Sequence, residues 1–327
     1  MAVLEKGNIT IHTENIFPII KKSLYTDHEI FLRELISNAV DAISKRKMAA
    51  FASDGSGEVP DPQITLVVDK VNKTLSITDN GIGMTADEVK KYINQVAFSS
   101  AEEFIEKFQK SANDLIGHFG LGFYSAFMVS QKVEIDTLSY QDGAQAVHWS
   151  CDGSPEFELT DSDRQQVGTT VTLTLLDDEQ EYLETGRIRQ LVKTYSDFMA
   201  VPIRFEGETL NKQRAIWKES PQNLTKEDYL EFYRYLYPFQ EEPLLWVHLN
   251  TDYPFLLNGI LYFPKLRPDV DVSTALCAAL PITLPKKLAI ALNLCTTKIP
   301  PNISNVGKTL VLLLNLVPCG KINSNNK

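Results

Sequence analysis

The stretch RELISNAVDA, residues 33–42, has the pattern of an amphipathic helix with an unusual polar side. Glu34, Asn38 and Asp41 are spaced i, i+4 and i+7, which places them on one face of a helix. By itself such a stripe is more typical of a solvated helix face. Its meaning therefore depends on the motifs that follow it. The apolar side of the same helix is formed by five residues: Leu35, Ile36, Ala39, Val40 and Ala42.

The composition is that of a soluble globular protein. The 327-residue chain is 43% hydrophobic and 23% charged, and it is long enough for two domains. A formal net charge of −10 argues against a nucleic-acid partner, which usually requires a basic surface. The four cysteines include no CxxC pair, so neither a zinc site nor a disulfide framework is expected. No signal-like segment and no apolar run of about 20 residues is present, so we expect a cytoplasmic location and no membrane partner.

The composition changes sharply after Asp271. All 42 acidic residues precede Val272, whereas three of the four cysteines follow it. One interpretation is an apolar C-terminal segment that packs on the rest of the chain. The interpretation we favour is a change of reading frame near Val272, so that residues 272–327 are an aberrant tail rather than a native domain.

The order of expected elements predicts an α+β fold, an α/β sandwich whose mostly antiparallel sheet has helices on one face. A helix is expected from about Ile16 to Ala50, strongest at 30–43, before a loop at 53–62. Thr85 and Glu88 have the spacing of a capping box at the start of the next helix. Further helices are expected at 101–110 and 180–199. Strands are expected at 64–69 and 74–79, which form a hairpin, and at 132–139, 146–151, 156–160 and 169–176.

The sequence predicts four segments. Residues 1–205 form the first domain and 206–217 a short linker. Residues 218–271 begin a second domain that is incomplete, and 272–327 form the aberrant tail. In the second domain Thr225 is expected to cap a helix that runs to about Tyr235, and strands are expected at 244–250 and 255–264.

Four short motifs follow one another along the first domain. Each is weak alone, because Asp-Asn-Gly is usually only a turn and a glycine-rich stretch is usually only a bend. Together they are specific. They are Glu34-x-x-x-Asn38-x-x-Asp41, Asp79-Asn-Gly81-Ile-Gly83, Gly117-His-Phe-Gly120-Leu-Gly122, and Gly168-Thr169-Thr170.

This order resembles the GHKL ATPase superfamily, which includes gyrase-type topoisomerases, histidine kinases and mismatch-repair ATPases. Longer matches, such as FLRELISNAVDAISKRK, ITDNGIGMT and IGHFGLGFYSAFMVS, are similar to the bacterial members of the heat-shock-protein-90 chaperone family within it. The segment WKESPQNLTKEDYLEFYRYLYPF resembles the start of that family's middle domain. The resemblance covers about residues 8–271 and implies a GHKL (Bergerat-type) ATP-binding domain.

The physical chemistry of the motif residues fits MgATP. The amide oxygen of Asn38 is a suitable ligand for Mg²⁺. Glu34, one turn away, can activate the water that attacks the γ-phosphate. Asp79 can accept a hydrogen bond from the adenine amino group, and its charge would strengthen that bond. Asp41 is expected to support these residues.

The resemblance extends the nucleotide-binding set beyond these residues. Glycines lead the chain closely past the base and offer backbone N–H groups to the phosphates. The resemblance places Thr169 near the adenine and Phe123 beside the phosphates. The full set expected to bind nucleotide is Asn38, Asp79, Gly83, Met84, Gly120, Gly122, Phe123 and Thr169.

Residues 94–122 correspond to the lid that closes over ATP in the family. Here Asn94 replaces the first glycine of the usual lid sequence, and Phe98 and Ser100 replace a lysine and a second glycine. Tyr92 stands where an asparagine that contacts the nucleotide is common. These departures bear on lid closure and phosphate affinity.

The resemblance implies an ATP-dependent chaperone that hydrolyses MgATP and assists folding of unfolded or partly folded client proteins, and whose full-length relatives are homodimers. A first alternative is a truncated nucleotide-binding module with little ATPase activity. A second is another GHKL enzyme. Against that second alternative, no phospho-acceptor helix of a histidine kinase precedes the domain, and the acidic charge is wrong for a topoisomerase.

Overall fold

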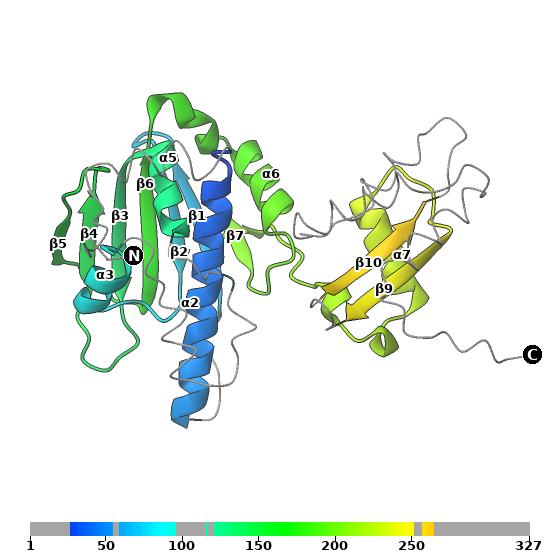
Figure 1. The fold of residues 1–327 in the computed structure, drawn as a ribbon. Helices are drawn as coiled ribbons and strands as arrows, with labels where there is room; N and C mark the ends of the chain where they lie inside the picture. Colours follow the sequence, from blue (N-terminus) through cyan, green and yellow to red (C-terminus); the bar gives the residue numbers. More distant parts are fainter. Residues whose placement is uncertain (1–26, 55–58, 96–115, 117–120, 252–256, 265–327) are drawn as a thin grey trace, which may run out of the picture. The chain divides into compact units, whose positions relative to one another are not determined.

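The computed structural model describes residues 27–54, 59–95, 116, 121–251 and 257–264 (Figure 1). The chain divides into two compact units between Arg214 and Ala215. Across the ranges just given, no helix has both the length and the apolar character that a bilayer crossing requires.

The first unit is built on an eight-stranded sheet with the order β5-β4-β3-β6-β2-β1-β7-β8. Every neighbouring pair is antiparallel except β1 and β7, which are parallel. The expected α+β fold with a mostly antiparallel sheet is therefore confirmed. The strands are β1 (Ile64–Asp69), β2 (Thr74–Asp79), β3 (Ser130–Leu138), β4 (Val147–Cys151), β5 (Glu158–Asp161), β6 (Gly168–Leu175), β7 (Ile203–Phe205) and β8 (Glu208–Thr209).

Helices pack on the sheet and enclose the core. Figure 1 shows α2 lying along the sheet with α5 and α6 beside it. Residues of β2 alternate between half-buried and buried, so every second side chain enters this core while the others form a polar outer face. The helices are α2 (Ile30–Asp54), α3 (Ala86–Tyr92), α5 (Ala126–Val129) and α6 (Thr185–Tyr195), with the 3₁₀ helices η4 (Gly122–Ser125) and η5 (Asp177–Leu183).

Several local predictions are confirmed. The expected hairpin of residues 64–69 and 74–79 is the β1–β2 pair, in which Ile64 faces Asp79. At the start of α3 the Thr85 hydroxyl accepts a hydrogen bond from Glu88 N, and the Glu88 carboxylate accepts one from Thr85 N. This reciprocal pair satisfies two N–H groups that a helix end would otherwise leave without partners.

Two predicted helices differ from the structure. Of the helix expected from about Ile16, residues 16–26 lie outside the described residues and 27–29 are not helical, while α2 runs from Ile30 to Asp54, past the predicted start of the loop at Ser53. The single helix expected at 180–199 is instead η5 followed by α6, because Glu184 has an extended backbone (φ −85°, ψ 124°). This break lets Tyr182 pack edge-on against Phe31, with ring centroids 4.9 Å apart, while α6 directs its own apolar residues into the core. The helix expected at 101–110 lies outside the described residues.

The second unit contains 3₁₀ turns η6 (Ile216–Lys218) and η7 (Pro221–Asn223), helix α7 (Lys226–Leu236), and the antiparallel hairpin of β9 (Leu245–Thr251) and β10 (Leu257–Phe263). The predicted cap is confirmed, since the Thr225 hydroxyl accepts from Asp228 N at the start of α7. Aromatic rings join the helix to the hairpin: the ring centroids of Tyr233 and Tyr262 are 4.9 Å apart.

Part of the segment expected as a linker, 206–217, is attached to the sheet of the first unit. It includes β8, and the buried Asn211 side chain accepts from Ile203 N and donates to the carbonyls of Met199 and Val201. The division between the two compact units falls inside the same segment, after Arg214.

Candidate functional site

The polar stripe on α2 runs from solvent into the protein. Asn38 is exposed, the Glu34 side chain is 22% exposed, and Asp41 is buried. The opposite side of α2 enters the hydrophobic core, which includes Phe31 and Leu35. Burial of that apolar side fixes the rotation of the helix, so the three polar residues predicted from their spacing share one face.

The two carboxylate oxygens of Glu34 have different surroundings. Arg33 donates to Oε1 from Nη2 at 2.5 Å and from Nε at 3.1 Å. Oε2 lies beside Gly122, the first residue of η4, so close that a Cβ atom there would be 2.5 Å away. The structure therefore joins two predicted site residues from distant motifs. The contact with Arg33 could not be read from spacing, because neighbouring residues on a helix do not face each other.

Asp41 connects α2 to the segment before the glycine-rich motif. Its Oδ1 accepts a hydrogen bond from Ile116 N at 2.8 Å. Burial lowers the pKa of Lys45, and the charges of Asp41 and Glu88 oppose that shift. The i,i+4 spacing of Asp41 and Lys45 is the sequence signal for this electrostatic attraction. These contacts fit the supporting role expected of Asp41.

Asp79 is a buried carboxylate at the end of β2. Its Oδ1 accepts a hydrogen bond from Gly81 N at 2.8 Å. Burial raises the pKa of Asp79 to about 7. The Gly81 N–H, the Arg164 charge, the Thr169 N–H and the Arg46 charge all act in the opposite direction and favour the anion.

Thr137 brings the residues around Asp79 together. Thr169 lies directly opposite Asp79 in the β2–β6 ladder, and its hydroxyl is 2.9 Å from the Thr137 hydroxyl. Met84 N donates to the same Thr137 oxygen, also at 2.9 Å. Thr137 belongs to no recognisable motif, so only the pairing of β3 with β6 reveals it.

The loop after β2 packs between α2 and the end of β3. Ile82 N donates to Ala42 O of α2, and Tyr140 N donates to Ile82 O. Gly83 has φ +64°, and a Cβ there would be 1.9 Å from Leu138 O. A glycine is therefore required at this position for both its conformation and its close approach to β3. Nearby, the Asn80 amide donates to the carbonyls of Pro60 and Asp61, so this residue closes a loop.

Phe123 of η4 is half-buried and packs on the core. Its ring lies edge-on to Trp149 at a centroid distance of 5.8 Å. The Trp149 indole N–H donates to the Asn94 amide oxygen at 2.9 Å, so the residue that replaces the family's glycine fastens this end of the predicted lid to β4. Gly120, Phe98 and Ser100 lie outside the described residues.

The polar stripe on α2 suits a metal ion that is coordinated mainly by water and phosphate groups rather than by protein side chains. In the part of the chain that the structure describes, no group of three or more His, Cys, Asp or Glu side chains is placed to hold a metal ion. An exposed amide and a carboxylate one turn apart are too few to make a protein cage. They do suit Mg²⁺, which keeps waters and takes its other ligands from phosphates.

Comparisons with known proteins match two regions of the chain. Residues 25–173 match the model of the histidine kinase-, DNA gyrase B-, and HSP90-like ATPase family, and residues 204–276 match the Hsp90 protein model. The chain is 53% identical over 285 residues to chaperone protein HtpG of Bacteroides fragilis, an alignment that covers 83% of this chain and 42% of that relative. HtpG of Porphyromonas gingivalis is 48% identical over 283 residues, covering 82% and 41% of the two chains. HtpG of Desulfitobacterium hafniense is 34% identical over 270 residues, covering 81% and 44%. The chain thus spans less than half the length of these curated relatives.

Proposed function

Because this chain belongs to the Hsp90 family and carries its GHKL-type ATPase domain, we propose that it binds MgATP between α2, the loop after β2, and η4, and hydrolyses it within a chaperone cycle. The observation that carries the proposal is the environment of Asp79. A buried carboxylate that accepts from Gly81 N and lies opposite Thr169 in the β2–β6 ladder, with Thr137 linking Thr169 to Met84, is an acceptor prepared for a donor such as the adenine amino group. The stripe on α2 supplies the more exposed groups that the phosphates need.

The base is recognised at the buried end of the site. Asp79 accepts from the adenine amino group, and Thr169 and Met84 border the base beside it. A donor that reaches a buried carboxylate replaces the hydrogen bonds that burial took away, so discrimination at this end is strong. Gly83 lets the chain pass close to the base without a side chain in the way.

The phosphates lie toward the exposed end. The Asn38 amide oxygen would hold Mg²⁺, which would neutralise charge on the phosphates when bound. Gly122 and Phe123 border the phosphates. Glu34 Oε2 orients the attacking water and takes its proton, while the water oxygen bonds to the γ-phosphorus and the bond to the β–γ bridging oxygen breaks. The products are ADP and inorganic phosphate.

The relatives are named chaperones, which supports client binding as the purpose of this ATPase. The partners are unfolded or partly folded proteins and, in the full-length family, a second copy of the chain. We assign residues 1–205 to the nucleotide-binding domain, 206–217 to a linker and 218–271 to the start of the middle domain. The division after Arg214 supports a boundary inside 206–217, and the Hsp90 match that begins at residue 204 supports a second domain of that family.

One contact bears on how Glu34 acts in the proposed hydrolysis. The ion pair with Arg33 occupies one oxygen of the Glu34 carboxylate. If this pair persists with nucleotide bound, Glu34 can act only through Oε2.

Calorimetry with MgATP tests the proposal. The unmodified chain is expected to bind, and Asp79→Asn is expected to abolish detectable binding because the amide replaces a charged acceptor. Asp142→Asn is the matched control, since Asp142 is exposed in the turn between β3 and β4. Equal binding by Asp79→Asn and Asp142→Asn would remove Asp79 from the site. Phosphate release measured on the same samples separates the ATPase from the binding module.

A further inference from the structure

Arg164 reaches the end of β2 from the segment between β5 and β6. Its Nη1 donates to the Thr170 hydroxyl at 2.7 Å, and its Nη2 donates to the main-chain carbonyl of Asp79 at 3.4 Å. A third guanidinium nitrogen, Nε, donates to Gln166 O at 2.8 Å. The fork geometry of arginine thus fixes this cation against the residue that carries the buried carboxylate.

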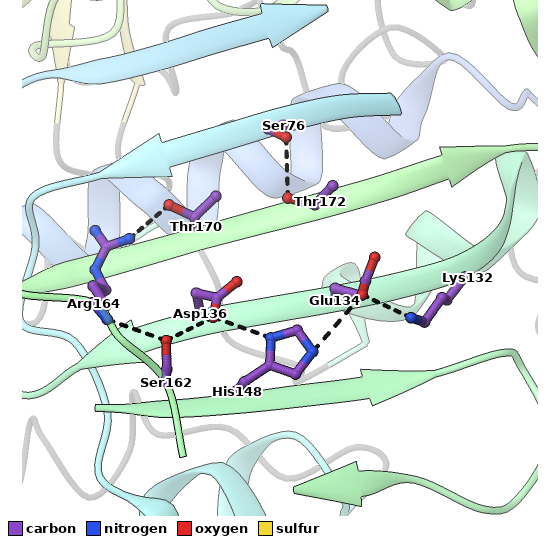
Figure 2. Close-up of polar contacts among 9 residues, drawn as sticks. All are labelled: Ser76, Lys132, Glu134, Asp136, His148, Ser162, Arg164, Thr170 and Thr172. Atoms are coloured by element: carbon purple, nitrogen blue, oxygen red, sulfur yellow. Dashed lines mark hydrogen bonds and ion pairs between the residues drawn. The ribbon is translucent and has the colours of Figure 1, made fainter. Parts of the chain in front are cut away.

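A polar network on the outer face of the sheet braces Arg164 (Figure 2). The Ser162 hydroxyl accepts from Arg164 N at 3.4 Å and donates to Asp136 Oδ1 at 2.8 Å. The same Asp136 oxygen is 3.0 Å from His148 Nδ1, and Asp136 also attracts the Arg164 charge. The network therefore holds the arginine from the solvent side.

A second arginine contacts the next residue of the chain. Arg46, on α2, donates from Nη1 to the main-chain carbonyl of Asn80 at 2.7 Å. Two guanidinium groups, from an α-helix and from a loop, therefore bind the consecutive carbonyls of Asp79 and Asn80. Neither arginine belongs to a motif of the site.

We propose that Arg164 and Arg46 are positioning residues for base recognition, which fix the main chain at the end of β2 and favour the anionic form of the Asp79 carboxylate that accepts the adenine amino group. This inference rests on the proposed function of the site. It adds a link between nucleotide binding and the polar outer face of the sheet.

The electrostatics agree with the geometry. Asp79 is deeply buried, and burial favours its neutral form. The charged side chains that stabilise its anion are Arg164, with the larger effect, and Arg46. The charged groups that face Arg164 are Asp79 and Asp136, and Asp79 is the one that faces Arg46. Removing either cation therefore raises the pKa of Asp79, so a larger fraction of the protein is protonated near neutral pH.

The experiment compares ADP binding by Arg164→Gln, Arg46→Gln and the unmodified protein between pH 6 and pH 8.5. The ratio of variant to unmodified Kd at each pH cancels the titration of the nucleotide phosphates. Well above the pKa of Asp79 the ratio is expected to be at its lowest, because only the lost anchoring of the main chain remains there. Toward pH 6 it is expected to rise to about 3–10 for Arg164→Gln and to less for Arg46→Gln, because a pKa difference of one unit corresponds to a tenfold change in binding.

Two further variants separate positioning from folding. Arg189→Gln removes an arginine from α6 that pairs with Glu206 and Glu208, and its Kd ratio is expected to stay near 1 at every pH. Arg164→Lys keeps the charge without the fork and is expected to restore most of the low-pH affinity. A Kd ratio for Arg164→Gln that is constant with pH would overturn the proposal, as would failure of Arg164→Lys to restore the profile.

A ligand-free measurement keeps this inference separate from the proposed function. NMR titration of the Asp79 carboxyl carbon, assigned with Asp79→Asn, is expected to show a higher midpoint in Arg164→Gln than in the unmodified protein. If no variant binds nucleotide but this midpoint moves, the proposed function fails while the electrostatic role of Arg164 stands. An unchanged midpoint rejects that role whatever the binding result.

Discussion

Gly122 lies against the carboxylate of Glu34, so that a methyl group on Gly122 would come within 2.5 Å of Oε2. The clashing atom is the end of a flexible side chain. Gly122→Ala is therefore expected to displace the Glu34 carboxylate while changing the free energy of unfolding by only about 1 kcal/mol or less. Misplacing a reacting group by about 1 Å can cost a hundredfold in rate, so turnover is expected to fall by about 10- to 100-fold. Phosphate release measures the turnover of Gly122→Ala, and urea denaturation measures its free energy of unfolding. Gly186→Ala on α6, where a Cβ meets nothing within 4 Å, is the control.

Gly83→Ala, unlike Gly122→Ala, is expected to lower the stability of the protein strongly. The left-handed backbone at φ +64° disfavours alanine, and the added Cβ would meet the rigid main chain at Leu138 O. We expect the free energy of unfolding to fall by about 3 kcal/mol, measured by urea denaturation. A Gly83→Ala protein as stable as Gly186→Ala would mean that the loop after β2 adjusts freely.

Glu34→Gln is expected to keep nucleotide affinity within about threefold while lowering turnover at least about 100-fold, the range typical of losing a general base. Calorimetry and steady-state phosphate release measure the two effects. Glu156→Gln, at an exposed position, is the charge-matched control. Unchanged turnover in Glu34→Gln would require a different base. Absence of turnover in the unmodified chain would favour the binding module.

Asp79 makes stability depend on pH. Its pKa is about 7 in the folded protein against the ordinary value of 3.8, so folding favours the protonated form. The stabilisation from this proton is full below about pH 4 and is lost as the pH rises to about 7, by up to about 1.4 kcal/mol per pH unit. Asp79→Asn removes this pH-dependent contribution to the free energy of unfolding. Its stability relative to the unmodified protein is therefore expected to rise between pH 4 and pH 7 and then to level off, as measured by urea unfolding at each pH. A difference that does not vary with pH would contradict the raised pKa.

Trp149 is expected to report nucleotide binding by fluorescence. Its indole packs against Phe123, which is proposed to border the phosphates, and donates to Asn94, which begins the predicted lid. Trp217 and Trp246 belong to the second compact unit. Titration with ADP should change the tryptophan emission, and Trp149→Phe should abolish the change. A signal that survives in Trp149→Phe would come from the other two tryptophans.

The parts of the fold that the sequence predicts well are local. The β1–β2 hairpin, the capping boxes at Thr85 and Thr225, and the polar face of α2 all follow from short-range spacing. The break at Glu184 was not predicted, because it depends on the extended backbone there and on the packing of Tyr182 against Phe31, a contact between residues far apart in the sequence.

The site was predictable in its motif residues and not in the residues that join them. The proposed roles of Glu34, Asn38 and Asp79 come from residue type, spacing and family resemblance. Thr137 and Arg164 contribute through strand register and a loop contact, which no local pattern encodes. The ion pair of Arg33 with Glu34 depends on side-chain direction rather than on helical spacing.

The contacts of the Thr137 hydroxyl depend on the register of strands β3 and β6. It contacts Thr169 across the β3–β6 pair and accepts from Met84 N, so it meets these partners only when the two strands are aligned correctly. A slip of one residue would turn Thr137 to the opposite face of the sheet and replace it with an outward-facing neighbour. Such a misaligned molecule could keep a full ladder of backbone hydrogen bonds and still fail to hold a nucleotide. Nucleotide would therefore shift the population toward molecules whose strands are in register, since it binds and stabilises only these molecules.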